Sequence, residues 1–181
     1  EVYKSDKYKK GSIVNNYILS LQEDNSNNLW VGTNKGISKI NLKTDEITNF
    51  ECDENGNPFY KVRSILLTER GTLIVITQKN VYLYDEKNNK FTVALHEQEI
   101  FKTEDIVDIK EDKSSNIWVG TTKSLIKVDR NTKEIIQYYS DDSGSIIKDD
   151  KINSILIDKE NNIWVSTSNN GLLKVIIKEG E

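Results

Sequence analysis

Few residues of this 181-residue chain combine a type and a spacing that would support catalysis. His96 is the only histidine, and a Ser-His-Asp set would require it as the base. It falls in a segment expected to be a loop, without a nucleophile motif nearby. Cys52, the only cysteine, has no candidate base in its sequence context and is interpreted as an inert, half-buried residue. We therefore predict no enzymatic activity and no catalytic residue.

Oxygen-bearing side chains recur at spacings that resemble part of a calcium loop. The sequence DENGN at 53–57 has them at alternate positions, but Pro58 stands where the loop requires glycine. Three further turns begin with an aspartate and continue with asparagine: Asp24, Asp112 and Asp158. They lack the glycine and the distal glutamate of a calcium loop, and side-chain hydrogen bonds to the turn backbone explain both residue types. We therefore expect no metal and no other cofactor.

The three tryptophans stand in nearly identical segments, NLWVGT at 28–33, NIWVGT at 116–121 and NIWVST at 162–167. Aromatic rings could stack on sugars. Packing between repeated units, however, requires one such residue per unit at a fixed strand position, and Ile74 in a fourth copy fits a purely apolar role. We assign a structural packing role to these residues and to two glycines that allow close approach: Trp30, Ile74, Trp118, Trp164, Gly32 and Gly120.

These segments are parts of an internal repeat. The four packing positions from Trp30 to Trp164 are 44, 44 and 46 residues apart. A second, aliphatic column has the same spacing: Ile18, Val62, Ile106 and Ile152. Each repeat holds short runs rich in Ile, Leu, Val, Trp, Tyr and Thr, separated by turns rich in Asn, Asp, Gly, Ser and Lys. Repeats of about 40 to 50 residues with four strands each are typical of β-propeller blades.

The sequence thus predicts an all-β propeller of about four four-stranded blades, forming a single domain or a fragment of one. The predicted blades are 17–60, 61–104, 105–150 and 151–181. Because the last blade has only three strands, residues 1–4 are expected to supply its fourth strand and to close a small ring. The alternatives are a part of a larger ring and a half-ring that pairs with a second chain. Residues 97–104 are predicted to form a loop with at most a short helical turn, because the repeat register overrules their helical propensity.

The composition argues against nucleic-acid binding and against a membrane-spanning segment within this sequence. The net charge is -4 and the pI about 5.2, so the chain lacks the basic footprint of a nucleic-acid-binding protein. No apolar stretch approaches the roughly 18 residues that a bilayer requires. The chain begins Glu-Val without methionine and is interpreted as a piece of a longer protein.

The segment 23–40, which contains ED, NLWVGT and GISKI in order, resembles the two-component regulator propeller repeat. Segments 106–129 and 152–175 resemble it as well, whereas 62–85 departs most, with Ile76 in place of the repeat's glycine. The resemblance implies the extracytoplasmic, periplasmic or cell-surface sensor part of a membrane-anchored bacterial signalling protein. It also implies a kinase or cyclase output domain outside this chain, a ligand such as a carbohydrate fragment, and rings of about seven blades.

Propeller ligands usually bind where the innermost strands begin and the turns between second and third strands emerge. Here that end carries amide, basic and aromatic side chains, which suit a polyhydroxylated or anionic ligand. Arg63 is the best single contact for an anion. The other candidate ligand-binding residues are Tyr60, Lys79, Asn34, Lys35, Lys123, Asn153 and Asn169. The alternative is that these are ordinary solvated turn residues of a scaffold for protein–protein interaction or self-association.

Overall fold

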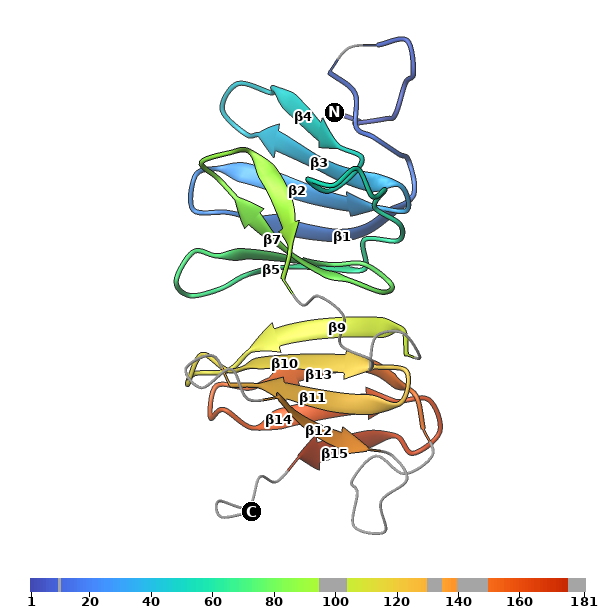
Figure 1. The fold of residues 1–181 in the computed structure, drawn as a ribbon, viewed down its shortest axis with the longest axis vertical. Coiled ribbons are helices and arrows are strands. Elements are labelled where there is room, and N and C mark those ends of the chain that lie inside the picture. The colour runs from blue at the N-terminus through green and yellow to red at the C-terminus, as the bar shows by residue number, and fades with distance from the viewer. Residues whose placement is uncertain (10, 95–103, 130–134, 140–149, 176–181) are drawn as a thin grey trace. The chain divides into compact units, whose positions relative to one another are not determined.

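The computed structural model describes residues 1–9, 11–94, 104–129, 135–139 and 150–175. The chain divides into two compact units, Glu1–Lys102 (unit 1) and Thr103–Glu181 (unit 2), which are described separately. In the described residues, the regular structure consists of strands in four antiparallel sheets, one for each repeat (Figure 1). The predicted all-β class is confirmed. None of the described residues lies in a helix long and apolar enough to cross a membrane.

Unit 1 contains two four-stranded sheets in which strands that follow one another in sequence are hydrogen-bonded neighbours. The first sheet consists of β1 (Ile18–Glu23), β2 (Asn28–Thr33), β3 (Gly36–Asn41) and β4 (Ile47–Phe50). The second consists of β5 (Ser64–Leu67), β6 (Leu73–Ile76), β7 (Val81–Asp85) and β8 (Lys90–Val93).

Unit 2 contains the third and fourth sheets, with the same antiparallel order. The third sheet consists of β9 (Ile106–Glu111), β10 (Ile117–Thr121), β11 (Ser124–Val128) and β12 (Ile135–Tyr139). The fourth consists of β13 (Ile152–Ile157), β14 (Ile163–Thr167) and β15 (Leu172–Val175). Within the described residues the fourth sheet therefore has the three strands that were predicted.

The turn between the first and second strands has the same backbone feature in all four sheets. One residue of each turn adopts a left-handed backbone: Asn27 (φ 59°), Gly71 (φ 79°), Ser115 (φ 63°) and Asn161 (φ 68°). Glycine has no side chain to oppose this conformation, and asparagine tolerates it better than most residues. The asparagine-rich turns of the sequence therefore fold into tight connections of similar geometry.

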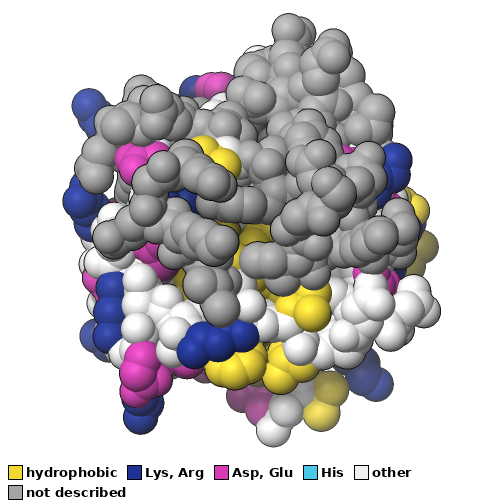
Figure 2. All heavy atoms as spheres, turned by 90° about the horizontal axis from the view of Figure 1, so that it is seen from below, with side chains coloured by type: hydrophobic (Ala, Val, Ile, Leu, Met, Phe, Trp, Pro, Cys, Tyr) yellow, Lys and Arg dark blue, Asp and Glu magenta, His cyan; other side chains and the backbone are white. Residues whose placement is uncertain are grey.

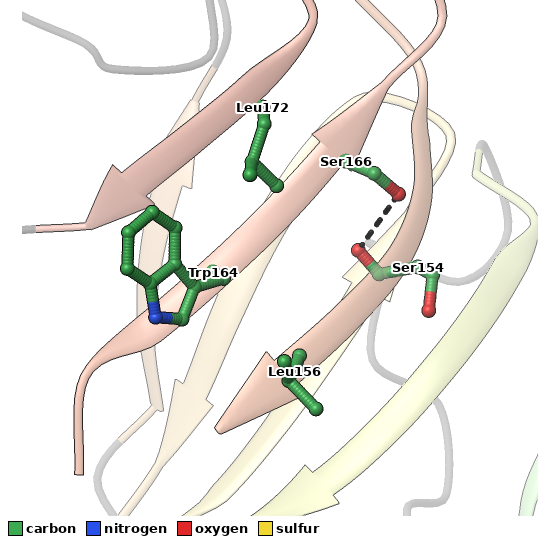
Figure 3. A pocket seen from close by; sticks show the side chains of 5 residues that line it. All are labelled: Ser154, Leu156, Trp164, Ser166 and Leu172. Carbon is green, nitrogen blue, oxygen red and sulfur yellow. Dashed lines mark hydrogen bonds between the residues drawn. The ribbon is translucent and has the colours of Figure 1, made fainter. Parts of the chain in front are cut away.

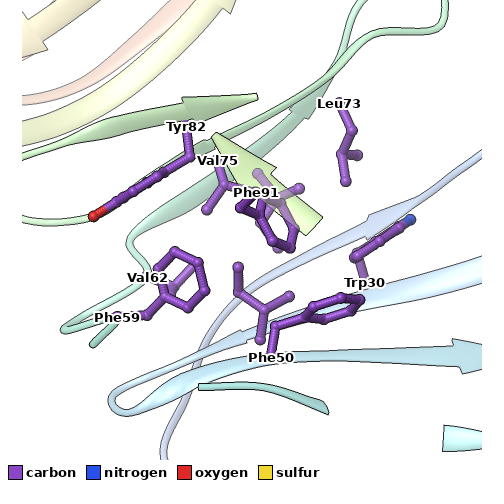
Figure 4. Close-up of a cluster of buried hydrophobic side chains, with 10 residues drawn as sticks. Trp30, Phe50, Phe59, Val62, Leu73, Val75, Tyr82 and Phe91 are labelled. Carbon is purple, nitrogen blue, oxygen red and sulfur yellow. The ribbon is translucent and has the colours of Figure 1, made fainter. Parts of the chain in front are cut away.

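The core of unit 1 lies between its two sheets (Figure 4). The first sheet contributes Trp30, Ile37 and Phe50, and the Trp30 ring meets Phe91 of the second sheet edge to face at 5.9 Å. The buried residues that face them are Phe59, Val62, Ile65, Leu73, Val75, Tyr82 and Phe91. Aromatic pairs of this kind add about 0.5 to 1.5 kcal/mol each beyond the burial of their area.

The core of unit 2 repeats this arrangement with fewer aromatic rings. Trp118 and Leu125 of the third sheet pack against aliphatic residues of the fourth: Ile152, Ile155, Ile163, Val165 and Val175. Successive side chains of a strand point to opposite faces of its sheet, so alternate residues face one neighbouring sheet and the residues between them face the opposite side. The predicted close approach at the glycines is confirmed. A Cβ atom at Gly32 would lie 2.7 Å from Val62 Cγ1, and one at Gly120 would lie 3.0 Å from Ile152 Cγ2.

Two predictions about single segments are wrong. Residues 1–4 form no strand. The Tyr3 hydroxyl donates a 3.3 Å hydrogen bond to Asp45 in the β3–β4 turn of the first sheet. Cys52 is exposed and not half-buried; it lies in the β4–β5 connection, where it forms an isolated antiparallel bridge with Pro58. The predicted loop at 97–104 and His96 fall almost wholly outside the described residues. The closure of a ring and the single-domain organisation stay predictions.

Candidate functional site

The predicted ligand-binding end of unit 1 is defined by four segments, 15–17, 34–35, 60–63 and 77–80, which are called the basic end below. β1, β3, β5 and β7 begin there, and β2 and β6 end there. Backbone hydrogen bonds connect the segments. The Asn34 N–H donates to the Tyr17 carbonyl at 3.0 Å, and the Lys61 N–H donates to the Asn34 carbonyl at 3.1 Å. The antiparallel fold thus brings Asn34, Lys35, Tyr60, Arg63 and Lys79 to one end of the unit.

Charge is distributed unequally between the two ends of unit 1. The basic end carries Lys35, Lys61, Arg63 and Lys79, and its four segments contain no aspartate or glutamate. The turns at the opposite end are 24–27, 42–46, 68–72 and 86–89, and acidic residues outnumber basic ones in them. A positive potential at the basic end favours an anionic ligand over a neutral one of the same shape.

Three acidic residues, Glu51, Asp53 and Glu54, follow β4 in the β4–β5 connection. The Glu54 N–H donates to the carbonyl of Phe91 in β8, and the Glu54 carboxylate forms an ion pair with Lys90 at 2.9 Å. Asp53 accepts hydrogen bonds from the backbone N–H groups of Asn55 and Asn57. The Glu54 carboxylate is therefore paired with Lys90, and the Asp53 carboxylate is bound by turn backbone N–H groups of its own connection.

Arg63 is the most unusual side chain at the basic end. It is half-buried, and its Nε atom is the one buried side-chain nitrogen or oxygen among the described residues that has no hydrogen-bond partner. Buried donors are almost always paired, because a buried N–H without an acceptor costs about 1 to 3 kcal/mol. The backbone N–H of Arg63 donates to the Ile76 carbonyl at 2.9 Å, which holds the residue beside the β6–β7 turn. A ligand acceptor would satisfy the Nε–H only after the half-buried side chain turns towards solvent.

The basic end also carries two aromatic rings. Tyr17 and Tyr60 are both exposed, and the Lys61 ammonium lies 5.3 Å from the centroid of the Tyr60 ring. Lys61 itself has a φ of 50°, a left-handed conformation that a lysine adopts at some cost. Exposed rings next to cationic groups offer both a stacking surface and charge to a ligand.

The corresponding end of unit 2 is chemically different. Buried carboxylates, Glu104 and Asp150, stand two residues before the first strand of each sheet. Glu104 accepts hydrogen bonds from the hydroxyl groups of Thr121 and Ser124. Lys123 is exposed in the adjoining turn. This end therefore carries acid and base together and lacks the single sign of charge found in unit 1.

Asn153 and Asn169, the other two predicted residues of unit 2, already have partners. The Asp150 carboxylate accepts from the backbone N–H groups of Asn169 at 2.7 Å and Asn170 at 2.6 Å, and from the Asn169 side chain at 3.0 Å. Asn153 accepts from the Ser168 hydroxyl at 3.2 Å. Desolvation acts to raise the pKa of Asp150, but these hydrogen bonds outweigh it and lower the pKa to about 2. The carboxylate therefore stays ionised and shapes this turn.

The aspartate turns and the tryptophans form a network that sequence reasoning missed. In the first sheet, Nε1 of Trp30 donates a 2.7 Å hydrogen bond to Oδ2 of Asp24. Asn28 donates to the same carboxylate with its backbone and side-chain N–H groups, and the Lys39 ammonium lies 5.1 Å from the Trp30 ring centroid. The role of the tryptophan is therefore not purely apolar, and that part of the prediction is wrong.

The third and fourth sheets repeat the network. The indole N–H groups donate to the corresponding aspartates, with Trp118 to Asp112 at 2.9 Å and Trp164 to Asp158 at 2.8 Å. A lysine faces each ring: Lys127 at 6.0 Å and Lys174 at 5.4 Å. The predicted bonding of aspartate side chains to the turn backbone is also confirmed. Within the described residues no group of His, Cys, Asp and Glu side chains has the geometry of a metal site.

The second sheet has lost the whole network together. Thr68 replaces the aspartate, Ile74 the tryptophan and Leu83 the lysine, and Ile74 pairs with Leu83 across the two strands. Thr68 still accepts the backbone N–H of Thr72 at 2.9 Å, which preserves the turn. This joint replacement was visible in the sequence as an Asp six residues before each tryptophan and a threonine six residues before Ile74.

The comparisons with known proteins support the predicted repeat and fold. The model of the family described as two component regulator propeller matches residues 12–35 and 137–169, which confirms the resemblance. None of the curated proteins matches the chain.

Two similar solved structures are extracellular domains assigned to hybrid two component systems of Bacteroides thetaiotaomicron. One aligns with a TM-score of 0.75 at 22% identity over 91% of this chain and 21% of its own. The other has a TM-score of 0.73 at 22% identity over 100% of this chain and 24% of its own. A catalytically inactive virginiamycin B lyase from Staphylococcus aureus, solved with quinupristin, has a TM-score of 0.61 at 15% identity over 90% of this chain and 56% of its own. These likenesses establish the β-propeller fold, and the chain spans about a fifth of the length of the two extracellular domains.

Proposed function

We propose that these two component regulator propeller repeats form a ligand-sensing module of a membrane-anchored bacterial signalling protein, and that the module lies outside the cytoplasm. The family match and the likeness to two extracellular domains support this placement. The output domain, a kinase or a cyclase, would belong to another part of the protein. Binding would act without catalysis, by shifting the population between two arrangements that the output domain distinguishes.

The ligand would bind at the basic end of unit 1. The observation that carries this proposal is the buried Nε of Arg63, which lacks a partner in a set of segments with four basic residues and no acidic one. The exposed rings of Tyr17 and Tyr60 could stack on a sugar ring, while the side chains of Asn34 and Lys35 could bind hydroxyl or carboxylate groups. A carbohydrate fragment that carries a carboxylate combines these features.

A thermal-shift comparison of two matched disaccharides tests the proposal. Digalacturonate carries carboxylates, and galactobiose has the same sugar skeleton without them. We expect digalacturonate to raise the melting temperature and galactobiose to raise it less, because only the former can pair with the guanidinium group of Arg63.

Two variants test whether the thermal shift arises from binding at the basic end. R63Q removes the guanidinium from the basic end, and R70Q removes the same group from the β5–β6 turn at the opposite end of the second sheet. The digalacturonate shift is expected to disappear in R63Q and to persist in R70Q. An equal loss in both variants would indicate unspecific charge attraction, and an unchanged shift in R63Q would contradict the proposed site.

The lyase among the similar structures raises an enzymatic alternative. Turnover would show as loss of the added saccharide during prolonged incubation with the protein, followed by chromatography. The proposed sensing role predicts that digalacturonate is recovered intact.

A further inference from the structure

Strand β7 carries two tyrosines whose hydroxyl groups reach opposite ends of unit 1. Tyr82 and Tyr84 stand two residues apart, so their side chains share the face of the second sheet that packs on the first sheet. Tyr82 is 1% exposed, and Tyr84 is half-buried. Each hydroxyl is hydrogen-bonded to the side chain of a turn residue, Tyr82 to Asn80 at 3.1 Å and Tyr84 to Asn89 at 2.6 Å. The two bonds therefore connect one core to the basic end and to the opposite end.

The hydroxyl of Tyr82 holds the 77–80 turn of the basic end. Nδ2 of Asn80 donates to this hydroxyl, and the backbone N–H of Asn80 donates to Oγ1 of Thr77 at 3.1 Å. The Thr77 N–H donates in turn to the Asn80 carbonyl at 2.9 Å. These three bonds close the turn that carries Lys79 and fix it to a buried phenol ring.

The ring of Tyr82 holds a second segment of the basic end. It meets the ring of Phe59 edge to face, with the two centroids 5.0 Å apart, and Phe59 is 2% exposed (Figure 4). Phe59 immediately precedes Tyr60, whose ring is 56% exposed. The position of the exposed ring therefore depends on how the buried ring before it packs. One side chain thus contacts both the turn that carries Lys79 and the residue that precedes Tyr60.

This arrangement belongs to the second sheet. The equivalent positions of the first and third sheets carry Ser38 and Ile126, neither of which has a phenol ring. The Ser38 hydroxyl donates to Asn49 in β4 at 2.6 Å and not to the turn between the second and third strands. Tyr82 therefore occurs in the sheet that also provides Arg63 and Lys79.

The single sign of charge at the basic end is a local feature. Figure 2 shows Lys, Arg, Asp and Glu side chains mixed among the described residues on one face of the molecule. A hollow of about 320 Å³ in the fourth sheet is formed by uncharged residues, and the Ser166 hydroxyl there donates to the Ser154 carbonyl at 3.4 Å (Figure 3). The lining residues are Ser154, Leu156, Trp164, Ser166 and Leu172. None of them provides a positive charge for a carboxylate, whereas the basic end does.

We propose that Tyr82 is a positioning residue for the ligand of unit 1. Its hydroxyl and its ring hold the 77–80 turn and Tyr60 at a fixed separation, so that an anionic saccharide meets a charge and a stacking surface together. The proposal rests on the proposed function, because it assigns a further residue to the same basic end. Tyr82 is buried and does not contact the ligand. It acts through preorganisation, since a turn that is ordered beforehand does not have to be ordered on binding.

Isothermal titration calorimetry with digalacturonate, well below the melting temperature, tests this role by comparing Y82F with Y84F. Each variant loses one tyrosine hydroxyl of β7 and one hydrogen bond to a turn asparagine, so Y84F is a matched control. We expect Y82F to weaken binding roughly twofold to tenfold, the effect of one neutral hydrogen bond, and Y84F to bind as the natural chain does. Hydrogen–deuterium exchange of the free proteins is expected to be faster at 77–80 in Y82F and at 86–89 in Y84F.

N80A shows whether the effect passes through the hydrogen bond. It breaks the same bond from an exposed turn residue and leaves the core intact, so it also replaces Y82F if that variant unfolds. The double variant Y82F/N80A is expected to bind as weakly as either single variant, because all three lack the same bond.

The outcomes separate the role of Tyr82 from the proposed function. If Y82F binds digalacturonate as tightly as the natural chain, or if the losses in Y82F and N80A add, the positioning role is overturned and the proposed site stands. Equal weakening in Y82F and Y84F would indicate a general loss of order and would overturn the role as well. A natural chain that binds no digalacturonate would refute the proposed site, and the role of Tyr82 with it.

Discussion

The indole N–H of Trp30 lies 2.7 Å from Oδ2 of Asp24, six residues earlier in the chain and on the far side of the β1–β2 turn. The carboxylate also fixes the turn, because it accepts from the backbone N–H groups of Ser26 and Asn28. One side chain thus connects the tight turn to the buried tryptophan of the sheet. This relationship recurs in the third and fourth sheets and is absent from the second, where its members are replaced together.

The first prediction concerns the strength of this connection. D24A removes the acceptor, and W30F removes the indole donor while keeping an aromatic ring. Because each change breaks the same hydrogen bond, their effects on the free energy of unfolding should not add, and the coupling should be about 1 to 3 kcal/mol for a bond to a charged group. Urea unfolding of the two single variants and the double variant measures this coupling. E46A, a change in an exposed turn residue, serves as the control. Additive effects would contradict the network.

The second prediction concerns the sheet that lacks the network. I74W introduces an indole at a buried position. Thr68 stands where the other sheets have the aspartate; its hydroxyl accepts the backbone N–H of Thr72 but provides no carboxylate for the indole N–H. The variant should be less stable than the natural chain, because it adds volume and a poorly paired N–H. Adding T68D supplies the missing acceptor. We expect T68D/I74W to melt at a higher temperature than I74W, whereas T68D alone should bring no gain. Equal melting temperatures for I74W and the double variant would exclude this explanation.

The third prediction follows from the ionisation of Asp158. The hydrogen bond from Trp164 is the main reason that its pKa falls from the ordinary 3.8 to about 2, and desolvation opposes it. A carboxyl whose pKa is lowered by folding adds stability that is complete above about pH 4 and is lost as the pH falls through about 2. The urea midpoint of the natural chain should therefore decrease between pH 4 and pH 2. D158N should start lower at neutral pH and decrease less, and an identical slope would show that Asp158 is not involved.

The fourth prediction concerns the close approach of sheets at Gly32 and Gly120, which share one position of the repeat. In G32A the new Cβ atom would lie 2.2 Å from the Ser20 hydroxyl and 2.7 Å from Val62 Cγ1, both too close. In G120A the nearest atom, Ile152 Cγ2, lies at 3.0 Å. We expect G32A to cost about 1 to 3 kcal/mol, as overpacking usually does, and G120A to cost less. Thermal unfolding of both variants provides the comparison, and the reverse order would contradict the packing described.

Much of the fold followed from the sequence, because the repeat gives the same evidence several times. The spacing of Trp30, Ile74, Trp118 and Trp164 predicted one sheet for each repeat, and alternation predicted the strands. The expectation for residues 1–4 failed for a physical reason. Residues 1–4 lack strand structure, and the hydroxyl of Tyr3 donates a hydrogen bond to Asp45 in the β3–β4 turn. The spacing of the repeat carries no information about such a side-chain contact.

The candidate site was predicted only in part. The topology placed Asn34, Tyr60, Arg63 and Lys79 at one end, as the repeat register indicated. Residue type alone could not show that Arg63 has a buried Nε without a partner, or that Asn169 is already bound by Asp150. Both depend on contacts between turns that are far apart in sequence. They separate a basic end in unit 1 from a mixed-charge end in unit 2.

The central claim is that unit 1 binds its ligand at the basic end. Hydrogen–deuterium exchange with and without digalacturonate tests it most directly, because the backbone of every turn reports separately. The account predicts slower exchange in peptides that contain 15–17, 34–35, 60–63 and 77–80, together with unchanged exchange in the turns at 24–27 and 68–72. Protection at those opposite turns, or no protection anywhere at saturating digalacturonate, would contradict it.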